Sequence, residues 1–256
     1  MSKTKTIAEI RNHKNNTMKI LDNYLESILN DDPKKVDLLS YWLHTYTNYL
    51  KFEDTFDPKK NIKYERGDIV RVNLGFNVGS EHGGRHYAVV LDNNNNHASP
   101  VITIIPLSSS NGQNIHPSSV YLGDDIYQKS IAKIKGLKQA YKAEQHEISE
   151  LMKTVKTLIE SANTDEKQIA TAQANVMMLT SKAESLNQKQ AELQKVQNEI
   201  SRMKIGSVAL VAQITTISKI RIEDPVTIHG ALNGIKLSAE NLDSINKKVQ
   251  ELYVYS

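Results

Sequence analysis

Apolar residues in the first sixty positions recur in steps of three and four, which places their side chains on one face of a helix. Two runs show this spacing, at 18–28 and at 36–50. Asp32 followed by Pro33 supplies an N-cap and a first-turn proline for the second run. The pattern therefore predicts two packed amphipathic helices that bury Trp42.

From Tyr64 onward the pattern becomes that of β-strands, with segments rich in β-branched residues between Gly, Asn and Pro. The segments with this pattern lie at 67–75, 85–93, 101–109, 119–122, 207–217 and 224–230. A last helix is predicted from Ser238 to about Leu252, because apolar spacing returns to that of a helix there.

The region between Gly136 and Gly206 contains neither Gly nor Pro, the residues that most often interrupt regular structure. Apolar residues there form two heptad seams with a polar link at 161–165 between them. The first seam consists of Ile134, Leu137, Tyr141, polar Glu144, Ile148, Leu151, Val155, Leu158 and Ala162. The second consists of Ile169, Ala172, Val176, Leu179, Ala183, Leu186, Gln190, Leu193, Val196, Ile200 and Met203. This spacing predicts an antiparallel coiled-coil hairpin.

The second seam contains one irregular step, because Val196 follows Leu193 after three residues where four are due. That step predicts a stammer. Lys and Arg nearly balance Asp and Glu along the hairpin, 13 to 11 over residues 124–204, which favours a solvated face over a nucleic-acid stripe. The apolar residues of the hairpin are used in its own seam, so we expect a modular insertion outside the core.

Strands flank the hairpin on both sides, and the strand at 119–122 needs partners that only the later strands can supply. The economical organisation is one β-rich domain, residues 61–124 plus 205–256. A coiled-coil insertion at 125–204 interrupts it and a helical extension at 1–60 precedes it. The fold class predicted from this order is α+β.

The composition is that of a globular protein, with 39% hydrophobic and 24% charged residues among 256 and a formal net charge of +3. The absence of cysteine excludes disulfides, thiolate zinc sites and a cysteine nucleophile. The eight histidines show no metal-ligand spacing, and no P-loop is present, so we expect no metal and no cofactor. The first twenty residues lack the apolar block of a secretory signal, and no apolar run approaches ~20 residues. We expect a cytoplasmic protein without membrane contact.

Short motifs follow one another around the glycine-rich segment. They read GDIV at 67–70, GSEHGG at 79–84, RHYAVVL at 85–91, VITIIPLSS at 101–109 and SVALVAQITTISKIRI at 207–222. In this order the motifs resemble those of the MazF/PemK family of toxin endoribonucleases from type II toxin-antitoxin systems. The first sixty residues and the hairpin lie outside the resemblance.

The resemblance implies a small SH3-like or CcdB-like β-barrel with a C-terminal helix. It also implies a homodimer that cuts single-stranded RNA without a metal ion and that an antitoxin protein holds in check. Such cleavage uses the 2′-OH of the substrate as nucleophile and leaves a 2′,3′-cyclic phosphate and a 5′-OH. The protein must accept the 2′-OH proton, stabilise charge on the phosphoryl oxygens and protonate the departing 5′-oxygen.

Carried over position by position, the resemblance assigns the family's catalytic carboxylate to Glu81 and its Thr or Ser to Ser108, with Ser109 as the alternative. The strand Arg of the family falls on His86, with Arg85 beside it. This departure matters, because Arg is always charged and His titrates near neutral pH. Neighbouring strand residues face opposite ways, so we expect only one of the two cations in the site unless the loop shifts by one residue.

Further residues are expected to contact RNA or to shape the loop. The expected RNA contacts are Arg71, Arg85, Ser109, Gln213 and Arg221. The loop glycines Gly79, Gly83 and Gly84 are expected to adopt backbone conformations that only Gly adopts cheaply.

Each candidate also has a structural explanation. Glu81 can satisfy loop amides, His86 can be a hydrogen-bonded strand residue, and Ser108 can be a strand-end hydroxyl. For the whole chain three functions stay open. The first is an endoribonuclease, and the second is a non-catalytic module that binds a target protein through the barrel and docks an unknown protein on the coiled-coil arm. The third is a toxin whose N-terminal helices cover its own groove.

Overall fold

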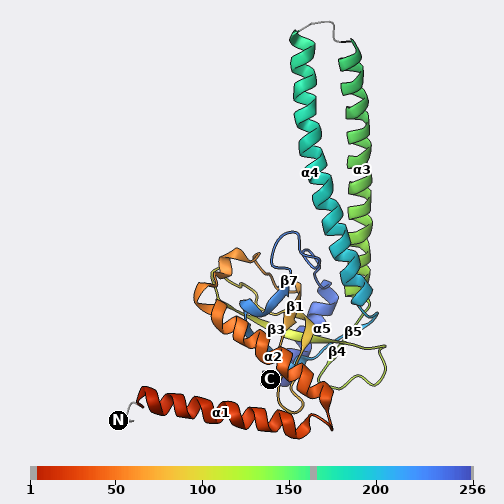
Figure 1. Ribbon diagram of the computed structural model, residues 1–256. Helices are drawn as coiled ribbons and strands as arrows, with labels where there is room; N and C mark the ends of the chain where they lie inside the picture. The colour runs from red at the N-terminus through yellow and green to blue at the C-terminus, as the bar shows by residue number, and fades with distance from the viewer. Residues whose placement is uncertain (1–4, 162–165, 255–256) are drawn as a thin grey trace. The chain divides into compact units, whose positions relative to one another are not determined.

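The computed structural model describes residues 5–161 and 166–254 (Figure 1). The chain forms two compact units. The smaller consists of the segment that ends at Phe56 together with Gly75–Gly79, and the larger of Asp57–Leu74 together with the chain from Ser80 onward. In the described residues no helix is long and apolar enough to cross a membrane.

The smaller unit contains the two predicted helices, α1 (Ile7–Ile28) and α2 (Pro33–Phe52), followed by a 3-10 turn at Glu53–Thr55. The Asp32 side chain accepts a hydrogen bond from the Lys35 N–H and Pro33 begins α2, as predicted. No residue of either helix is buried. The prediction that the helices bury Trp42 is therefore wrong, because two helices of this size enclose no interior.

Trp42 is half-buried among a few aromatic neighbours instead. Its ring centroid lies 5.8 Å from that of Tyr46 and 6.2 Å from that of Tyr49. The same ring covers Gly75, where an added Cβ would come within 2.5 Å of a ring carbon. Gly75 has a φ of +85°, so both its conformation and its lack of a side chain are needed.

The described residues of the larger unit form an antiparallel sheet and three α-helices. Its elements are a 3-10 turn (Pro58–Lys60), β1 (Ile69–Asn73), β2 (Arg85–Val90), β3 (Val101–Ser109), β4 (Val120–Gly123), α3 (Asp125–Ser161), α4 (Glu166–Arg202), β5 (Ser207–Ala209), β6 (Thr215–Ser218), β7 (Ile222–Asp224) and α5 (Ala239–Tyr253). The strand order is β4-β5-β3-β2-β1-β7, and β6 pairs with β3 beside β5. This mixture of helices and antiparallel sheet confirms the α+β class.

The predicted strand at 207–217 is divided in two. β5 pairs with residues 107–109 of β3, β6 pairs with residues 101–104, and a 3-10 turn at Val211–Gln213 separates them. Two short strands thus lie along β3, which is nine residues long.

The predicted strand at 224–230 is wrong. The actual strand, β7, ends at Asp224 and follows a 3-10 turn at Lys219–Arg221. The Asp224 carboxylate accepts hydrogen bonds from the backbone N–H groups of Ala231 and Leu232, at 3.0 and 2.7 Å. These bonds hold the segment after Asp224 as a loop.

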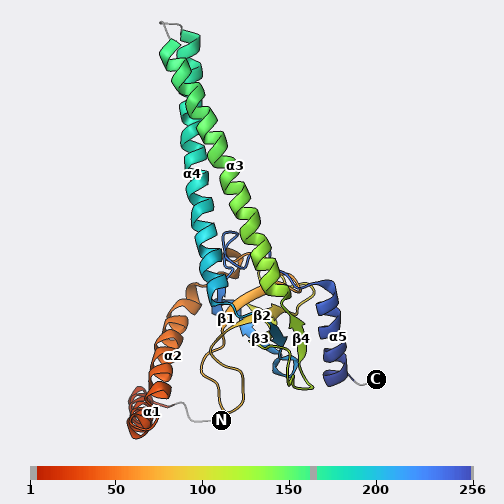
Figure 2. The ribbon, with the colours of Figure 1, turned by 90° about the vertical axis from the view of Figure 1, so that its right-hand side faces the viewer.

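Both faces of the sheet are covered by apolar side chains. One buried cluster contains Ile69, Val89 and Ile105 from the strands and Ile245 from α5. α5 lies beside β4 in Figure 2, and the Ser238 side chain caps its first turn. The other cluster contains the opposite faces of the same strands and packs against Tyr64.

α3 and α4 run side by side in opposite directions (Figure 1), as the predicted hairpin requires. The predicted seam of α3 is its less exposed line over the described residues. Glu144, the polar residue within that seam, is buried. It forms an ion pair with Lys189 and accepts a hydrogen bond from the Ser185 hydroxyl. The polar link at 161–165 lies largely outside the described residues.

The seam of α4 differs from the prediction. Ile169 and Val176 are 44% and 48% exposed, whereas Asn175, Lys182 and Lys189 are half-buried. When Asn175, Lys182 and Lys189 take the seam positions predicted for Val176, Ala183 and Gln190, the steps between seam residues alternate between three and four from Ala172 as far as Val196. The predicted stammer is therefore absent. Ion pairs explain this choice of seam positions, because Lys182 and Lys189 pair with the carboxylates of Glu147 and Glu144 on α3. A lysine can take such a position because its aliphatic stem packs against apolar surface while its ammonium reaches a partner.

The base of the hairpin, residues 125–133 and 192–204, is joined to the sheet. Ile126 belongs to the buried cluster beneath it, and the Lys133 ammonium donates to the carbonyls of Gly230, Ala231 and Asn233 at 2.8–3.1 Å. The expectation that the whole hairpin lies outside the core is therefore wrong. Sequence spacing identifies the seam between two helices, but not the contacts that one turn makes with a distant sheet.

The start of α3 is also bonded to α5. The Asp125 carboxylate accepts hydrogen bonds from the Ser238 N–H at 2.8 Å and the Asn241 amide at 3.0 Å, and it pairs with Lys129 at 3.0 Å. Burial raises the pKa of Asp125, but these bonds outweigh burial and hold it below its ordinary value.

Candidate functional site

A cavity of about 600 Å³ lies between the strands and the base of the hairpin. Strands β1, β2, β3, β5 and β7 contribute to its lining, and so do the ends of α3 and α4. The cavity brings together five of the predicted site residues, namely Arg71, Arg85, His86, Ser108 and Ser109. Glu81, Gln213 and Arg221 are not among its lining residues.

The pairing of β2 with β3 brings His86 near Ser108. Ala88 pairs with Pro106, and the same antiparallel register continued by two residues sets His86 opposite Ser108. Both residues line the cavity, and so does Arg85. The expectation that only one of Arg85 and His86 reaches the site is therefore wrong. Arg85 is the first residue of β2 and its side chain is 67% exposed, so it is free to bend around the strand end.

A second histidine lies against His86. The ring centroids of His82 and His86 are 3.9 Å apart. Burial lowers the pKa of His82, and the neighbouring His86 lowers it further. The neutral form of the His82 ring is therefore favoured.

Gln213 holds the loop that carries His82. Its side-chain oxygen accepts from the His82 N–H, and its amide donates to the Ser80 carbonyl, both at 3.3 Å. Glu81 is exposed in this loop. The Arg221 guanidinium donates to the Leu74 carbonyl at 3.2 Å, away from the cavity lining.

Two of the three loop glycines have the expected conformation. Gly79 and Gly84 have φ values of +64° and +86°. Gly83 is not among the residues with positive φ, so the backbone explanation does not apply to it.

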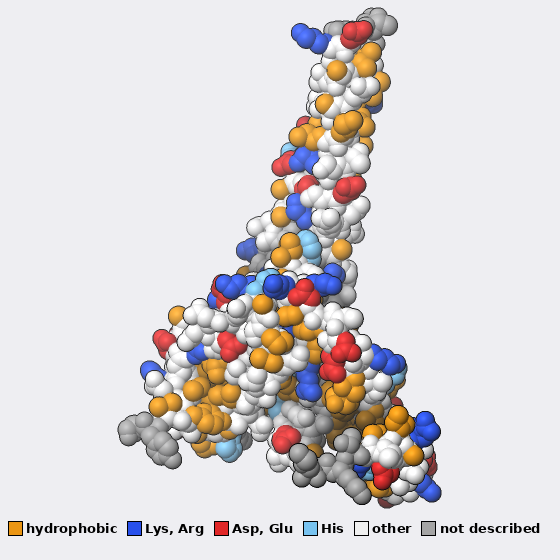
Figure 3. All heavy atoms as spheres, turned by 90° about the vertical axis from the view of Figure 1, so that its left-hand side faces the viewer, with side chains coloured by type: hydrophobic (Ala, Val, Ile, Leu, Met, Phe, Trp, Pro, Cys, Tyr) orange, Lys and Arg blue, Asp and Glu red, His pale blue; other side chains and the backbone are white. Residues whose placement is uncertain are grey.

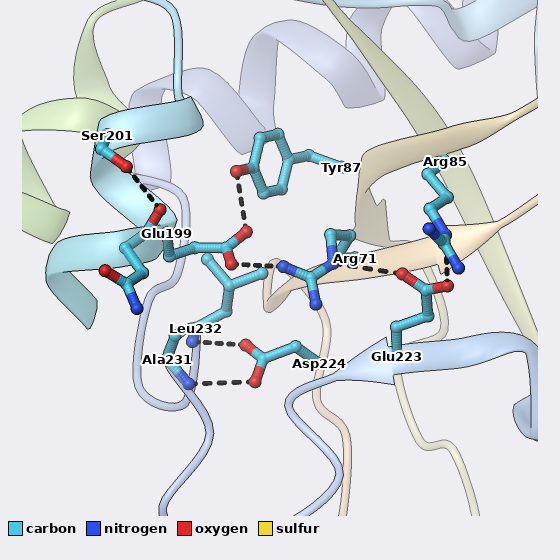
Figure 4. Close-up of polar contacts among 10 residues, drawn as sticks. Arg71, Arg85, Tyr87, Glu199, Ser201, Glu223, Asp224, Ala231 and Leu232 are labelled. Atoms are coloured by element: carbon cyan, nitrogen blue, oxygen red, sulfur yellow. Dashed lines mark hydrogen bonds and ion pairs between the residues drawn. The ribbon is translucent and has the colours of Figure 1, made fainter. Parts of the chain in front are cut away.

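Two arginines of the cavity, Arg71 and Arg85, share the Glu223 carboxylate, and Arg71 also pairs with Glu199 (Figure 4). Arg71 of β1 donates to Glu199 of α4 through Nη1 and pairs with Glu223 of β7 through Nε at 3.3 Å. The other oxygen of Glu223 accepts from Arg85 Nε at 2.7 Å. Glu199 also accepts from the Tyr87 hydroxyl at 2.8 Å. The hairpin thus contributes a carboxylate to the lining of the cavity.

Glu199 is only 6% exposed, and its neighbours show the effect of a buried charge. Burial raises the pKa of Tyr87 and the adjacent Glu199 raises it further, so the phenol stays protonated. Burial alone would lower the pKa of Arg71, but Glu199 and Glu223 raise it on balance. This cluster is a closed ion-pair network that ties α4 to β1 and β2.

Two further cations line the cavity at the end of α4, Arg202 and Lys204. Across the described residues neither forms an ion pair with a carboxylate. The positive charge of Arg202 lowers the pKa of Tyr87, in opposition to Glu199. Lys and Arg side chains gather where the hairpin meets the sheet, as Figure 3 shows.

Sequence reasoning missed Tyr87, Glu199, Arg202, Lys204 and Glu223. Glu199 follows Val196 by three residues, which places the two side chains next to each other on α4, and this is the one signal that could have revealed it. Across 5–161 and 166–254, no group of three or more His, Asp or Glu side chains has a geometry that could hold a metal ion.

Comparison with known families finds a similarity that covers part of the sheet and the first helix of the hairpin. No curated protein matches the chain. The sequence model of one family, described as PemK-like, MazF-like toxin of type II toxin-antitoxin system, matches residues 65–163. The match includes β1 to β4 and α3, whereas the motif at 207–222 lies beyond it. Over residues 65–163 the chain is therefore similar to the PemK-like, MazF-like toxin family, in agreement with the resemblance of its motifs.

Proposed function

We propose that the protein is an endoribonuclease toxin that cleaves single-stranded RNA without a metal ion. The observation that carries the proposal is the cavity that His86, Ser108 and Arg85 line together. It combines a group able to move a proton, a hydroxyl and a guanidinium, which are the parts that phosphodiester cleavage by a 2′-OH requires.

In the proposed reaction His86 accepts the proton of the 2′-OH while the 2′-oxygen forms a bond to phosphorus. The bond from phosphorus to the 5′-oxygen breaks, and the imidazolium of His86 returns the proton to that oxygen. Ser108 donates a hydrogen bond to a phosphoryl oxygen, and Arg85 contacts the phosphate with the nitrogens that Glu223 leaves available. The products are a 2′,3′-cyclic phosphate and a 5′-OH.

The similarity of residues 65–163 to the toxin family supports a wider set of proposals. We propose an SH3-like barrel for the sheet, with domain limits at 61–124 plus 205–256, a coiled-coil insertion at 125–204 and a helical extension at 1–60. We further propose a homodimer, an antitoxin protein as partner and a cytoplasmic location. RNA contacts are proposed at Ser109 and Arg85, which line the cavity.

The test is incubation of the pure protein with a mixed single-stranded RNA in EDTA, followed by analysis of the new ends. His86→Ala should lower the cleavage rate by about 10²- to 10⁴-fold, the usual worth of general acid-base catalysis. His146→Ala is the matched control, because His146 is exposed on α3 outside the cavity. Ser108→Ala should cost less if the hydroxyl only orients the phosphate.

Two results would change the conclusion. If His86→Ala cleaves as the wild type does and Arg85→Ala is inactive, Arg85 is the catalytic cation. If the wild type leaves RNA intact with and without EDTA, the enzyme proposal fails. The alternative is then a non-catalytic module that binds a protein through the barrel and the coiled-coil arm.

A further inference from the structure

Cleavage of a phosphodiester needs a cation that is not already neutralised, because negative charge grows on the phosphoryl oxygens as the 2′-oxygen attacks. The cavity contains four permanently cationic side chains. They are Arg71, Arg85, Arg202 and Lys204. The ion pairs that each of them already forms within the protein determine which is available to bind a phosphate.

Arg71 is already neutralised by ion pairs within the protein. It bonds to Glu199, which is buried, and to Glu223. Moving Arg71 to a phosphate would leave Glu199 with the Tyr87 hydroxyl as its remaining bonded partner, and an uncompensated buried charge is costly. Arg71 is therefore a structural cation.

Arg85 forms one ion pair within the protein, with Glu223. Its Nε is occupied by Glu223, and its side chain extends into solvent from the strand end. It can contact a phosphate at the rim, but it shares its carboxylate partner with Arg71.

Arg202 differs from both. It is exposed, lines the cavity and has no carboxylate partner in the described part of the chain. It follows Glu199 by three residues, so the two side chains are neighbours on one helix face. The bonds that fix Glu199 to Arg71 and Tyr87 therefore also fix where Arg202 emerges.

We propose that Arg202 of the hairpin binds the phosphate cleaved in this cavity, which makes the hairpin base part of the active site. The inference rests on the proposed function. Lys204 is the less suitable cation, because a guanidinium offers two parallel donors to a phosphate and an ammonium does not.

The experiment compares Arg202→Ala with Lys195→Ala in the full-length protein. Lys195 lies seven residues earlier, on the same face of α4 about 10.5 Å up the hairpin, and does not line the cavity. Both variants remove one positive charge. We expect Arg202→Ala to cleave RNA about 10²- to 10³-fold more slowly, as for loss of one transition-state donor, and Lys195→Ala to stay near the wild-type rate. Arg202→Lys should fall between them.

Binding of an uncleavable 2′-O-methyl RNA gives a second, independent readout. Loss of one phosphate contact should reduce the slope of log affinity against log salt by about 0.7 for Arg202→Ala and leave it unchanged for Lys195→Ala. If wild type does not cleave, the proposed function fails, and the binding slopes still test Arg202. Equal effects of the two substitutions, or an Arg202→Ala variant that cleaves and binds as the wild type does, would overturn the proposal.

Discussion

The ion pair between α4 and β1 allows a sharp test of how the hairpin is attached. Glu199→Gln keeps the shape of the side chain and removes its charge. The amide oxygen can still accept from the Tyr87 hydroxyl, but Arg71 loses one of its two carboxylates. The substitution therefore isolates the charge of Glu199.

The expected cost follows from burial and from the partners that remain. Removal of one member of a buried ion pair typically costs about 3–5 kcal/mol. Here the Arg71 side chain is 25% exposed and keeps Glu223, so part of that cost is recovered. We expect Glu199→Gln to destabilise the junction by about 2 kcal/mol, at the level of a hydrogen bond to a charged group.

Hydrogen exchange of the β1 and β2 amides, followed by mass spectrometry, measures this local free energy of opening. The control is Glu251→Gln, which breaks an exposed pair with Lys248 on α5 and should cost no more than about 0.5 kcal/mol. Replacing both Glu199 and Arg71 by apolar residues should recover much of the loss. A change below about 0.5 kcal/mol for Glu199→Gln, or additive effects in the double variant, would refute the reasoning.

Three further predictions concern other parts of the chain. Replacing residues 141–190 with a short Gly-containing turn should leave a cooperatively melting sheet by circular dichroism, because the hairpin base is kept, whereas replacing 126–204 should abolish the transition. The lowered pKa of Asp125 stabilises the α3–α5 contact fully above its ordinary value of 3.8 and less as pH falls through the lowered value. Acid titration of exchange in α5 should show this loss, and Asp125→Asn should remove the pH dependence. Gly75→Ala should shift the emission of Trp42, the single tryptophan, and destabilise its unit by about 1 kcal/mol or more, since φ is +85° and the ring occupies the space. Unchanged emission and melting would contradict that prediction.

Local spacing in the sequence was sufficient for much of the fold. β3 has the bounds predicted from its β-branched residues, Ser238 begins the last helix, and the seam of α3 is its less exposed line. These features depend on neighbours within a few residues, so the order of residue types determines them. The glycine-rich motifs likewise indicated the toxin family whose sequence model matches residues 65–163.

The tertiary structure decided what depends on distant partners. Which of two adjacent positions of α4 faces α3 follows from lysines that reach Glu144 and Glu147 on the other helix. The pair between Arg71 and Glu199 joins residues 128 positions apart, and no local pattern encodes such a contact. The sequence could thus nominate His86 and Ser108, whereas the closing of the site by the hairpin depends on a long-range ion pair that forms only when the strands and α4 are assembled.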